Sequence, residues 1–273
     1  MSESRAERVV DALFDLYSDE YSPFPSENIG VEEGQDTSIN SVQSQNVYWQ
    51  KAYGGQDAFE CLVRTILSQN TSDKASQPAH DQLMARYGPE NELAETLVDV
   101  SLDDLAETIS SAGLYNQKST VIQRAAEWVL DEFGSTTAFD EYVRDGEPDE
   151  VRDTLLGVKG VGPKTADCVL LFSGGRGGVF PVDTHVHRIA RRMGLAPADA
   201  DHEDVREYLE RDVPAEKCGF GHTAMIQFGR EYCTARKPAC LDDPEACPLA
   251  DVCDQVGVYP ETGDVIDPAD APE

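Results

Sequence analysis

Residues 155–166, with the sequence LLGVKGVGPKTA, decide the fold. Apolar text before Gly157 ends one helix, and Pro163 opens the next, because proline fits a first helical position whose N–H has no intrahelical partner. The glycines between them permit positive φ angles and leave backbone N–H groups uncovered. Such groups at a helix N-terminus bind phosphate, so we expect the turn to hold a nucleic-acid backbone without reading its bases. The alternative is an ordinary connection between helices. The residues expected to make the contact are Lys159, Gly160, Val161 and Gly162.

The rest of the chain also has a helical pattern. Apolar residues recur with helical spacing, and turn signals such as Ala112-Gly113 separate the segments. Strand-like alternation is nearly absent, which predicts an all-α fold of many short helices. The candidate helices are 4–17, 56–69, 73–87, 102–111, 117–133, 148–156, 163–173, 184–193, 202–211 and 217–231.

Two segments lack this pattern. Residues 19–46 are rich in acids, prolines and glycines, which indicates a long surface loop or insertion. Residues 259–273, most clearly DVIDPADAPE at 264–273, have the composition of an acidic disordered tail.

Two polar residues follow the turn. Lys164 lies in the first turn of the helix that Pro163 opens, and Asp183 stands nineteen residues later in the sequence PVDTHVHR. A carboxylate at that place can cap a helix by accepting from its first N–H groups. Taken singly, Lys164 is a phosphate-binding or solvated lysine and Asp183 is only a cap. The chain has only seven lysines, so the position of each is informative.

The order of hairpin, Lys164 and Asp183 resembles the helix–hairpin–helix DNA glycosylase superfamily, specifically its endonuclease III branch, over residues 56–256. The resemblance implies that the Lys164 amine attacks C1′ of a damaged nucleotide, displaces the base and forms a Schiff base that permits β-elimination. Asp183 would stabilise positive charge on the sugar and assist proton transfer. A neutral amine is needed for the attack, and partial burial at a helix N-terminus would lower the pKa of Lys164.

The resemblance also implies a domain organisation and a partner. A helix–hairpin–helix domain would span 56–183, and an iron–sulfur cluster domain would span 184–258. The N-terminal helix and polar insertion of 1–55 would pack with the second of these domains. DNA and the active site would lie in the cleft between two all-α domains. We expect a monomer that binds double-stranded DNA containing damaged bases or abasic sites.

The presence of Lys164 bears on the class of activity. Adenine-specific members of the superfamily lack this lysine, so its presence favours a bifunctional glycosylase and AP lyase of base excision repair, acting on oxidised or damaged pyrimidines. Two alternatives stay open. One is a monofunctional thymine or uracil mismatch glycosylase of the same fold, and the other is a non-catalytic iron–sulfur protein that binds DNA or senses redox state.

Two loops resemble the elements with which this superfamily fills the gap left by an extruded base. In LSQNTSDK (67–74), Gln69 would enter the vacated space beside Asn70, and in GLYNQK (113–118), Leu114 would wedge into the base stack with Lys118 nearby. The alternatives are a helix cap for the first loop and a packed loop for the second.

Four of the seven cysteines form a C-x6-C-x6-C-x5-C pattern near the C-terminus, which indicates a [4Fe–4S] cluster or a zinc ion. CTARKPAC (233–240) resembles the cluster loop of endonuclease III, which implies a [4Fe–4S] cluster and phosphate contacts from Arg236 and Lys237. In the family, two residues separate the second cysteine from the third, whereas here the acidic segment 241–246 makes this separation six residues. We expect that segment to form a surface bulge. Cys61, Cys168 and Cys218 are not expected to be ligands. The expected ligands are Cys233, Cys240, Cys247 and Cys253.

The chain is strongly acidic, with 22 Lys and Arg against 52 Asp and Glu and a net charge of −30. Either the acids form a surface that repels nucleic acid, or the protein is adapted to very high salt. Their spread along the whole chain favours adaptation to salt, as in a halophilic archaeon. Molar salt screens charges beyond about 3 Å, so DNA binding would depend on short-range contacts. We expect the acids to avoid the DNA-facing elements, which carry Lys74, Lys118, Lys159, Lys164, Arg188, Arg236 and Lys237.

The sequence also predicts a location. No apolar stretch approaches 18 residues, and the N-terminus MSESR lacks the pattern of a signal peptide. We therefore expect a cytoplasmic, nucleoid-associated protein with no membrane partner.

Overall fold

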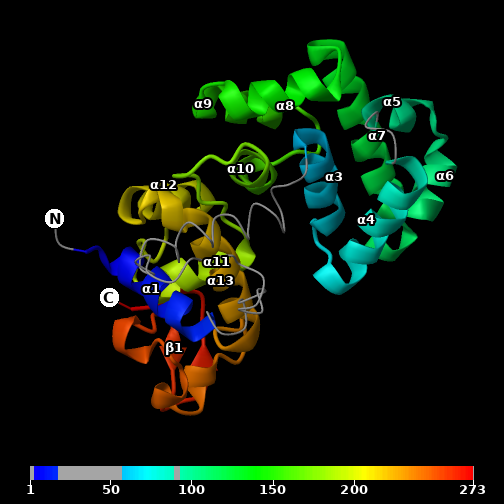
Figure 1. Cartoon of the computed structure of the whole chain (residues 1–273). Helices are drawn as coiled ribbons and strands as arrows, with labels where there is room; N and C mark the ends of the chain where they lie inside the picture. The colour runs from blue at the N-terminus through cyan, green and yellow to red at the C-terminus, as the bar shows by residue number, and fades with distance from the viewer. Residues whose placement is uncertain (1–2, 18–56, 89–92, 273) are drawn as a thin grey trace, which may run out of the picture. The chain divides into compact units, whose positions relative to one another are not determined.

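The computed structural model describes residues 3–17, 57–88 and 93–272. The chain divides into two compact units, one of Met1–Trp49 with Gly177–Glu273 and one of Gln50–Arg176. Figure 1 shows that both are built of α-helices, so the all-α prediction is confirmed. None of the described helices combines the length and apolarity needed to cross a membrane. The predicted insertion at 19–46 lies outside the described residues.

The unit of Gln50–Arg176 is built around helix α3 (Ala58–Ser68), which packs against α4, α7, α8 and α10. Asp57 caps α3 by accepting from the Glu60 N–H, and Phe59, Leu62 and Ile66 are fully buried. The other helices of the unit are α4 (Asp73–Tyr87), α5 (Leu93–Asp99), α6 (Leu102–Thr108), α7 (Tyr115–Phe133), α8 (Thr136–Asp145), α9 (Pro148–Leu156) and α10 (Pro163–Phe172), with the 3₁₀ turn η1 (Ser110–Ala112).

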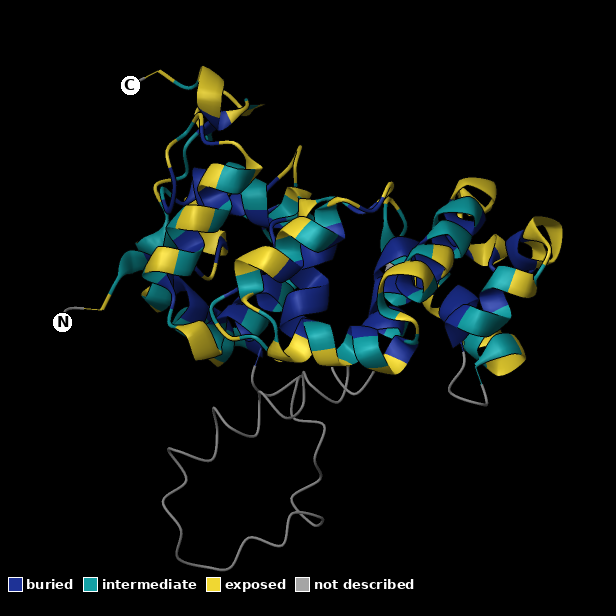
Figure 2. Cartoon of the chain, turned by 90° about the horizontal axis from the view of Figure 1, so that it is seen from above, coloured by how far each residue is buried: buried dark blue, intermediate teal, exposed yellow. Residues whose placement is uncertain are grey.

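The second unit joins the N-terminal helix to the C-terminal part of the chain. Helix α1 (Arg5–Tyr17) packs against α12 and α13, and Lys217 binds the carboxylates of Glu7 and Asp11 on it. The other helices of this unit are α11 (Thr184–Arg192), α12 (His202–Asp212) and α13 (Cys218–Glu231), with short 3₁₀ turns η2 (Ala215–Lys217), η3 (Ala239–Leu241), η4 (Pro244–Ala246), η5 (Ala250–Val252) and η6 (Pro268–Asp270). Buried residues run along all four described helices of this unit, and α11 and α13 have almost no exposed residues (Figure 2).

The prediction of a disordered C-terminal tail is wrong. Strands β1 (Val258–Tyr259) and β2 (Asp264–Val265) form an antiparallel hairpin, and Val258 pairs with Val265. The buried Arg191 then donates to the Asp267 carboxylate, and Pro268 is buried. The composition of the segment gave no sign of these anchors, because Arg191 lies 76 residues away in sequence.

The sequence pattern also missed helices α5 and α8. Helix α5 has only seven residues, too few for a clear helical period. Helix α8 begins at a Ser135 cap whose hydroxyl accepts from the Ala138 N–H. Its buried side contains Thr136, Phe139 and Val143, a face too narrow to stand out in the sequence.

Candidate active site and cluster loop

The turn between α9 and α10 has the local geometry that its glycines predict. Gly160 has a φ of +103°, and a Cβ there would lie 2.7 Å from the Val121 side chain, so only glycine fits. Gly162 precedes α10 as its N-cap, and Pro163 is the first helical residue. The helix–hairpin–helix of the sequence prediction is therefore formed by α9, this turn and α10.

The residues of the turn differ in what they offer to a ligand. Lys159 and Gly160 are exposed, and among the described residues no backbone carbonyl accepts from the amides of Gly160 and Gly162. Val161 differs from the prediction, because its side chain is buried and its N–H donates to the Val158 carbonyl at 2.9 Å. Val161 therefore closes the turn and leaves the glycine amides available for an anion.

The two candidate catalytic residues stand at the beginnings of two helices in different units. Lys164 is half-buried in the first turn of α10. Asp183 caps α11, as predicted: its Oδ1 accepts from the N–H groups of His185 at 2.8 Å and Val186 at 2.9 Å. Both bonds use one oxygen, so the cap does not occupy Oδ2.

Gln69 lies beside the hairpin. Its Nε2 donates to the Gly160 carbonyl and to the Thr165 hydroxyl, each at 3.1 Å. Thr165 follows Lys164 in the chain, so this amide is fixed one residue from the candidate nucleophile. Asn70, the next residue, is exposed and has a φ of +51°, a conformation that few non-glycine residues adopt.

Leu114 does not pack into the protein. Its side chain is 52% exposed, next to a 39% exposed Tyr115, and its φ of +50° is unusual for a branched apolar residue. Gly113 before it also has a positive φ, of +58°. An exposed leucine held in a costly conformation disagrees with a simple packed loop and suits an element that inserts elsewhere.

Lys118 was predicted to contact DNA, but the structure buries its side chain inside the unit. The residue is only 4% exposed, and Nζ donates to the Leu67 carbonyl at 2.7 Å, the Thr71 hydroxyl at 2.6 Å and the Ala112 carbonyl at 2.8 Å. Burial lowers the pKa of Lys118 to about 8. Its ammonium therefore joins parts of this unit and does not offer charge to a phosphate.

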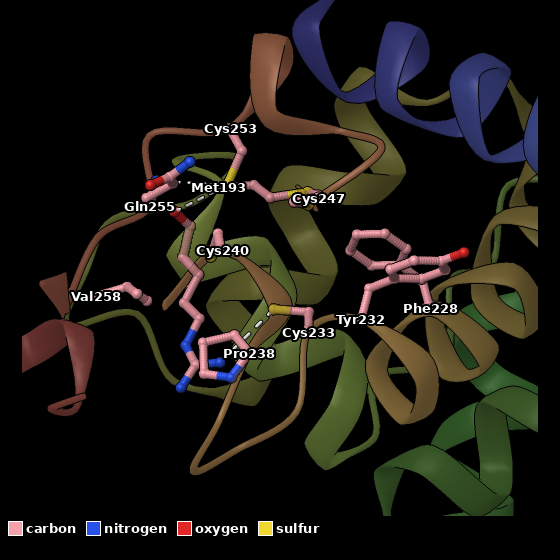
Figure 3. A pocket seen from close by; sticks show the side chains of 11 residues that line it. Met193, Phe228, Tyr232, Cys233, Pro238, Cys240, Cys247, Cys253, Gln255 and Val258 are labelled. Carbon is pink, nitrogen blue, oxygen red and sulfur yellow. Dashed lines mark hydrogen bonds between the residues drawn. The ribbon is translucent and has the colours of Figure 1, made fainter. Parts of the chain in front are cut away.

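The four cysteines of the C-terminal pattern line one pocket, together with Arg192, Met193 and Phe228 (Figure 3). Arg192 is buried and donates to Cys233 Sγ at 3.6 Å and to the carbonyls of Thr234 and Ala235 at 2.7 Å. The Gln255 N–H donates to Cys253 Sγ at 3.3 Å. Two of the four sulfur atoms, those of Cys233 and Cys253, thus accept from N–H donors, which stabilise thiolates.

Burial opposes ionisation of these thiols in the absence of a cation. It raises the pKa values of Cys240 and Cys247, and it raises that of Cys253 to about 12. A bound metal supplies the positive charge that makes such thiols ligands.

The sulfur atoms do not form a closed site for a single small ion. Within the described ranges, no three of the cysteine sulfurs lie within 4.8 Å of one another. A tetrahedral zinc site, with Zn–S bonds of about 2.3 Å, would have its sulfurs about 3.8 Å apart.

The insertion between the second and third cysteines forms the predicted surface bulge. Residues 242–246 are exposed, whereas Cys240 and Cys247 on its two sides are buried. Arg236 and Lys237, the predicted phosphate contacts, are exposed as well. Lys237 pairs with Asp242 of the insertion at 3.1 Å.

Arg188, expected on an element that faces DNA, has its side chain bound to the cysteine loop. Its guanidinium donates to the Cys233 carbonyl at 2.9 and 3.0 Å, to the Gly229 carbonyl at 3.1 Å and lies 3.2 Å from His185 Nδ1. Burial lowers the pKa values of Arg188 and His185. Arg188 thereby joins the start of the cysteine loop to the first turn of α11, which Asp183 caps.

Comparisons with known proteins agree with this geometry. Residues 63–215 match the HhH-GPD superfamily of base excision DNA repair proteins, and residues 233–253 match the iron–sulfur binding domain of endonuclease III. Endonuclease III of Bacillus subtilis is 33% identical over 196 residues, 71% of this chain and 80% of the relative. That of Sulfolobus acidocaldarius is 30% identical over 198 residues, 72% of this chain and 82% of the relative.

Solved structures give the same assignment. A non-covalent endonuclease III–DNA complex and a trapped endonuclease III–DNA covalent intermediate each have a TM-score of 0.60 and 27% identity, and cover 79% of this chain and 95% of their own. The match to the superfamily spans more than half of the chain, and the second match covers all four cysteines of the loop. The chain therefore belongs to the HhH-GPD superfamily of base excision DNA repair proteins, as an endonuclease III-like DNA glycosylase and AP lyase with a [4Fe–4S] cluster.

Proposed function

We propose that Lys164 is the nucleophile of this glycosylase and lyase, that Asp183 supports it, and that the substrates are oxidised or damaged pyrimidines in double-stranded DNA. One observation carries the proposal. Lys164 stands half-buried in the first turn of α10, directly after the two glycines whose amides are available to a phosphate. A strand bound at the hairpin would therefore present its sugars close to this amine. An endonuclease III 27% identical to this chain has been trapped as a covalent intermediate with DNA.

The reaction follows from an amine at this place. The lone pair of neutral Nζ forms a bond to C1′ while the bond from C1′ to the base breaks, and the base leaves with that electron pair and takes up a proton. Opening of the sugar gives an iminium between Nζ and C1′. Loss of a proton from C2′ then expels the 3′ phosphate, which cuts the strand. The Asp183 carboxylate, with Oδ2 not used by its cap, would stabilise positive charge on the sugar.

The cluster would be held by Cys233, Cys240, Cys247 and Cys253. These four line one pocket, and Arg192 donates to the first of them. When bound, the cluster supplies positive charge for buried thiolates and fixes the loop that carries Arg236 and Lys237. Those two exposed cations would then contact phosphate.

Borohydride trapping tests the role of Lys164. The probes are duplexes with thymine glycol, dihydrouracil, or thymine or uracil opposite guanine, assayed at low salt and in molar KCl. We expect a covalent adduct on the first two probes, its loss in Lys164→Ala, and a fall in excision of about 10³-fold or more. Lys217→Ala is the matched control, since this lysine binds Glu7 and Asp11 on α1. Excision without any adduct in the wild type would contradict the proposal and indicate a monofunctional mismatch glycosylase.

A further inference from the structure

The buried Lys118 has no place in the chemistry described above. An ammonium has three donors and no acceptor, and here each donor meets one oxygen, of Leu67, Thr71 or Ala112. No carboxylate among the described residues pairs with it. Lysines are rarely buried without such a partner, because removing the charge from water is unfavourable. A buried lysine that binds only backbone carbonyls and a hydroxyl therefore marks a place where its three contacts matter.

Those contacts join two segments far apart in sequence. Leu67 is in the last turn of α3, and Thr71 lies in the loop after it, whereas Ala112 ends η1 just before Gly113. The Thr71 hydroxyl also lies 2.6 Å from the Ala112 carbonyl. The ammonium and this hydroxyl thus tie the loop 69–72 to the loop 113–114.

Each tied loop carries a residue with a positive φ at its tip. Asn70 follows Gln69 in the first loop with a φ of +51°, and Leu114 in the second has a φ of +50°. Asparagine tolerates this conformation, but a branched apolar residue does not favour it, so surrounding contacts must hold Leu114. The contacts of Lys118 lie next to Asn70, at Thr71, and two residues before Leu114, at Ala112.

We propose that Lys118 is a positioning residue for opening the duplex: it holds the Gln69 loop and the Leu114 loop as one rigid pair, at the separation needed to support DNA around one extruded nucleotide. The inference rests on the proposed function, since it takes Gln69 and Leu114 as the residues that enter the duplex. Lys118 itself touches neither the reacting atoms nor a phosphate. Its loss should therefore impair the extrusion of the nucleotide more than the chemistry that follows.

The test compares a paired lesion with one that is already unpaired. Thymine glycol is placed opposite adenine in one duplex and inside a three-nucleotide bubble in another, with 2-aminopurine beside it to report unstacking. For Lys118→Met we expect single-turnover excision from the paired duplex to fall at least tenfold, with Kd changed less than threefold and the fluorescence rise lost. Excision from the bubble should stay within threefold of the wild type. An equal loss on both probes would overturn the proposal, because it would indicate a merely structural role.

A double-mutant cycle tests whether Lys118 acts through Leu114. If it does, the double variant Lys118→Met/Leu114→Ala should excise the lesion from the paired duplex no more slowly than Leu114→Ala alone. A loss in the double variant equal to the product of the two single losses would contradict this role. Lys217→Met, which removes the hydrogen-bonded lysine of the other unit, should leave the ratio of paired to bubble rates unchanged.

Folding and the underlying assignment are checked separately. If Lys118→Met does not fold, Thr71→Val removes the shared hydroxyl and leaves the lysine, and the same loss on the paired duplex alone is expected. Normal excision by Lys164→Ala would refute the proposed function. If Lys164→Ala is inactive but Leu114→Ala excises like the wild type, the positioning role fails and the assignment of the nucleophile stands.

Discussion

Two loop systems of the molecule are each held by buried cations, but in different ways. In the hairpin-containing unit, Lys118 ties the loops at 69–72 and 113–114 with hydrogen bonds to protein oxygens only. In the other unit, Arg192 ties the cysteine loop, whose four pocket-lining thiols are the proposed ligands of the metal cluster. The first system is complete as a polypeptide, whereas the second depends on its cofactor. The comparison predicts that the two respond differently to substitution, to pH and to loss of iron.

Loss of the cluster should have the largest effect. We expect Cys240→Ser, or removal of iron with a chelator under oxidising conditions, to abolish the visible absorption and destabilise the cysteine-containing unit by several kcal/mol. The helices of Gln50–Arg176 should stay folded, because no cysteine of the loop lies in that unit. Hydrogen exchange resolves the two units, with Cys218→Ser as the control, since Cys218 does not line the pocket. Equal loss of protection in both units would contradict the division.

Arg192→Met should have the next largest effect. It leaves the carbonyls of Thr234 and Ala235 without their buried donor, which we expect to lower the free energy of unfolding by about 2–4 kcal/mol. Thermal unfolding with the cluster bound measures it. Arg211→Met is the control, because Arg211 lies at the surface, where it pairs with Asp212 and stacks on the Tyr208 ring. A change no larger than that of the control would mean that the cluster alone holds the loop.

The pH dependence of stability tests the loop system that Lys118 holds. Burial lowers the pKa of Lys118 to about 8 from an ordinary 10.5, so between these values the unfolded chain holds a proton that the folded chain has lost. The free energy of unfolding of the wild type should therefore rise with pH over this window, by about 1–2 kcal/mol relative to Lys118→Met. Thermal melts of both proteins at pH 7 and pH 10 measure the difference. A constant or shrinking difference would contradict a lowered pKa of Lys118.

The smallest effect on stability is expected at the surface of the cysteine loop. Lys237 and Asp242 form an ion pair in which the side chains are 70% and 71% exposed. Such exposed pairs contribute little to the free energy of unfolding. Lys237→Ala should leave Tm unchanged within error but weaken binding to a duplex with a reduced abasic site. Asp242→Ala, which frees the lysine, should leave Tm unchanged and strengthen that binding. Weakened binding in both variants would refute a phosphate contact by Lys237.

The parts of the fold that could be predicted from the sequence are those determined by residues close together in the chain. Gly160, Gly162 and Pro163 determine the hairpin through their own backbone preferences, and Asp183 caps the helix that begins at the next residue. The cysteines fall within one short loop, so their spacing alone indicated a metal site. The roles of Lys164 and Asp183 remain predictions.

The parts that the sequence could not predict depend on distant partners. Lys118 reads as a surface lysine of a helix, and its inward direction is set by oxygens up to 51 residues away. The C-terminal hairpin is anchored to Arg191, 76 residues before Asp267, and the Arg188 side chain is held by a carbonyl 45 residues later. The scarcity of lysine in the chain indicated that Lys118 was informative, but it could not show whether the side chain points into the protein or into solvent.

The bulge at 242–246 has a practical consequence. It is an exposed segment whose two ends are fixed by buried cysteines, and added chain length is tolerated at such exposed places. A short peptide epitope inserted between Asp243 and Pro244 would project into solvent from the cysteine loop. Tethered through that epitope to a surface, single molecules of the protein could be watched as they scan a stretched DNA, with both chain ends left native.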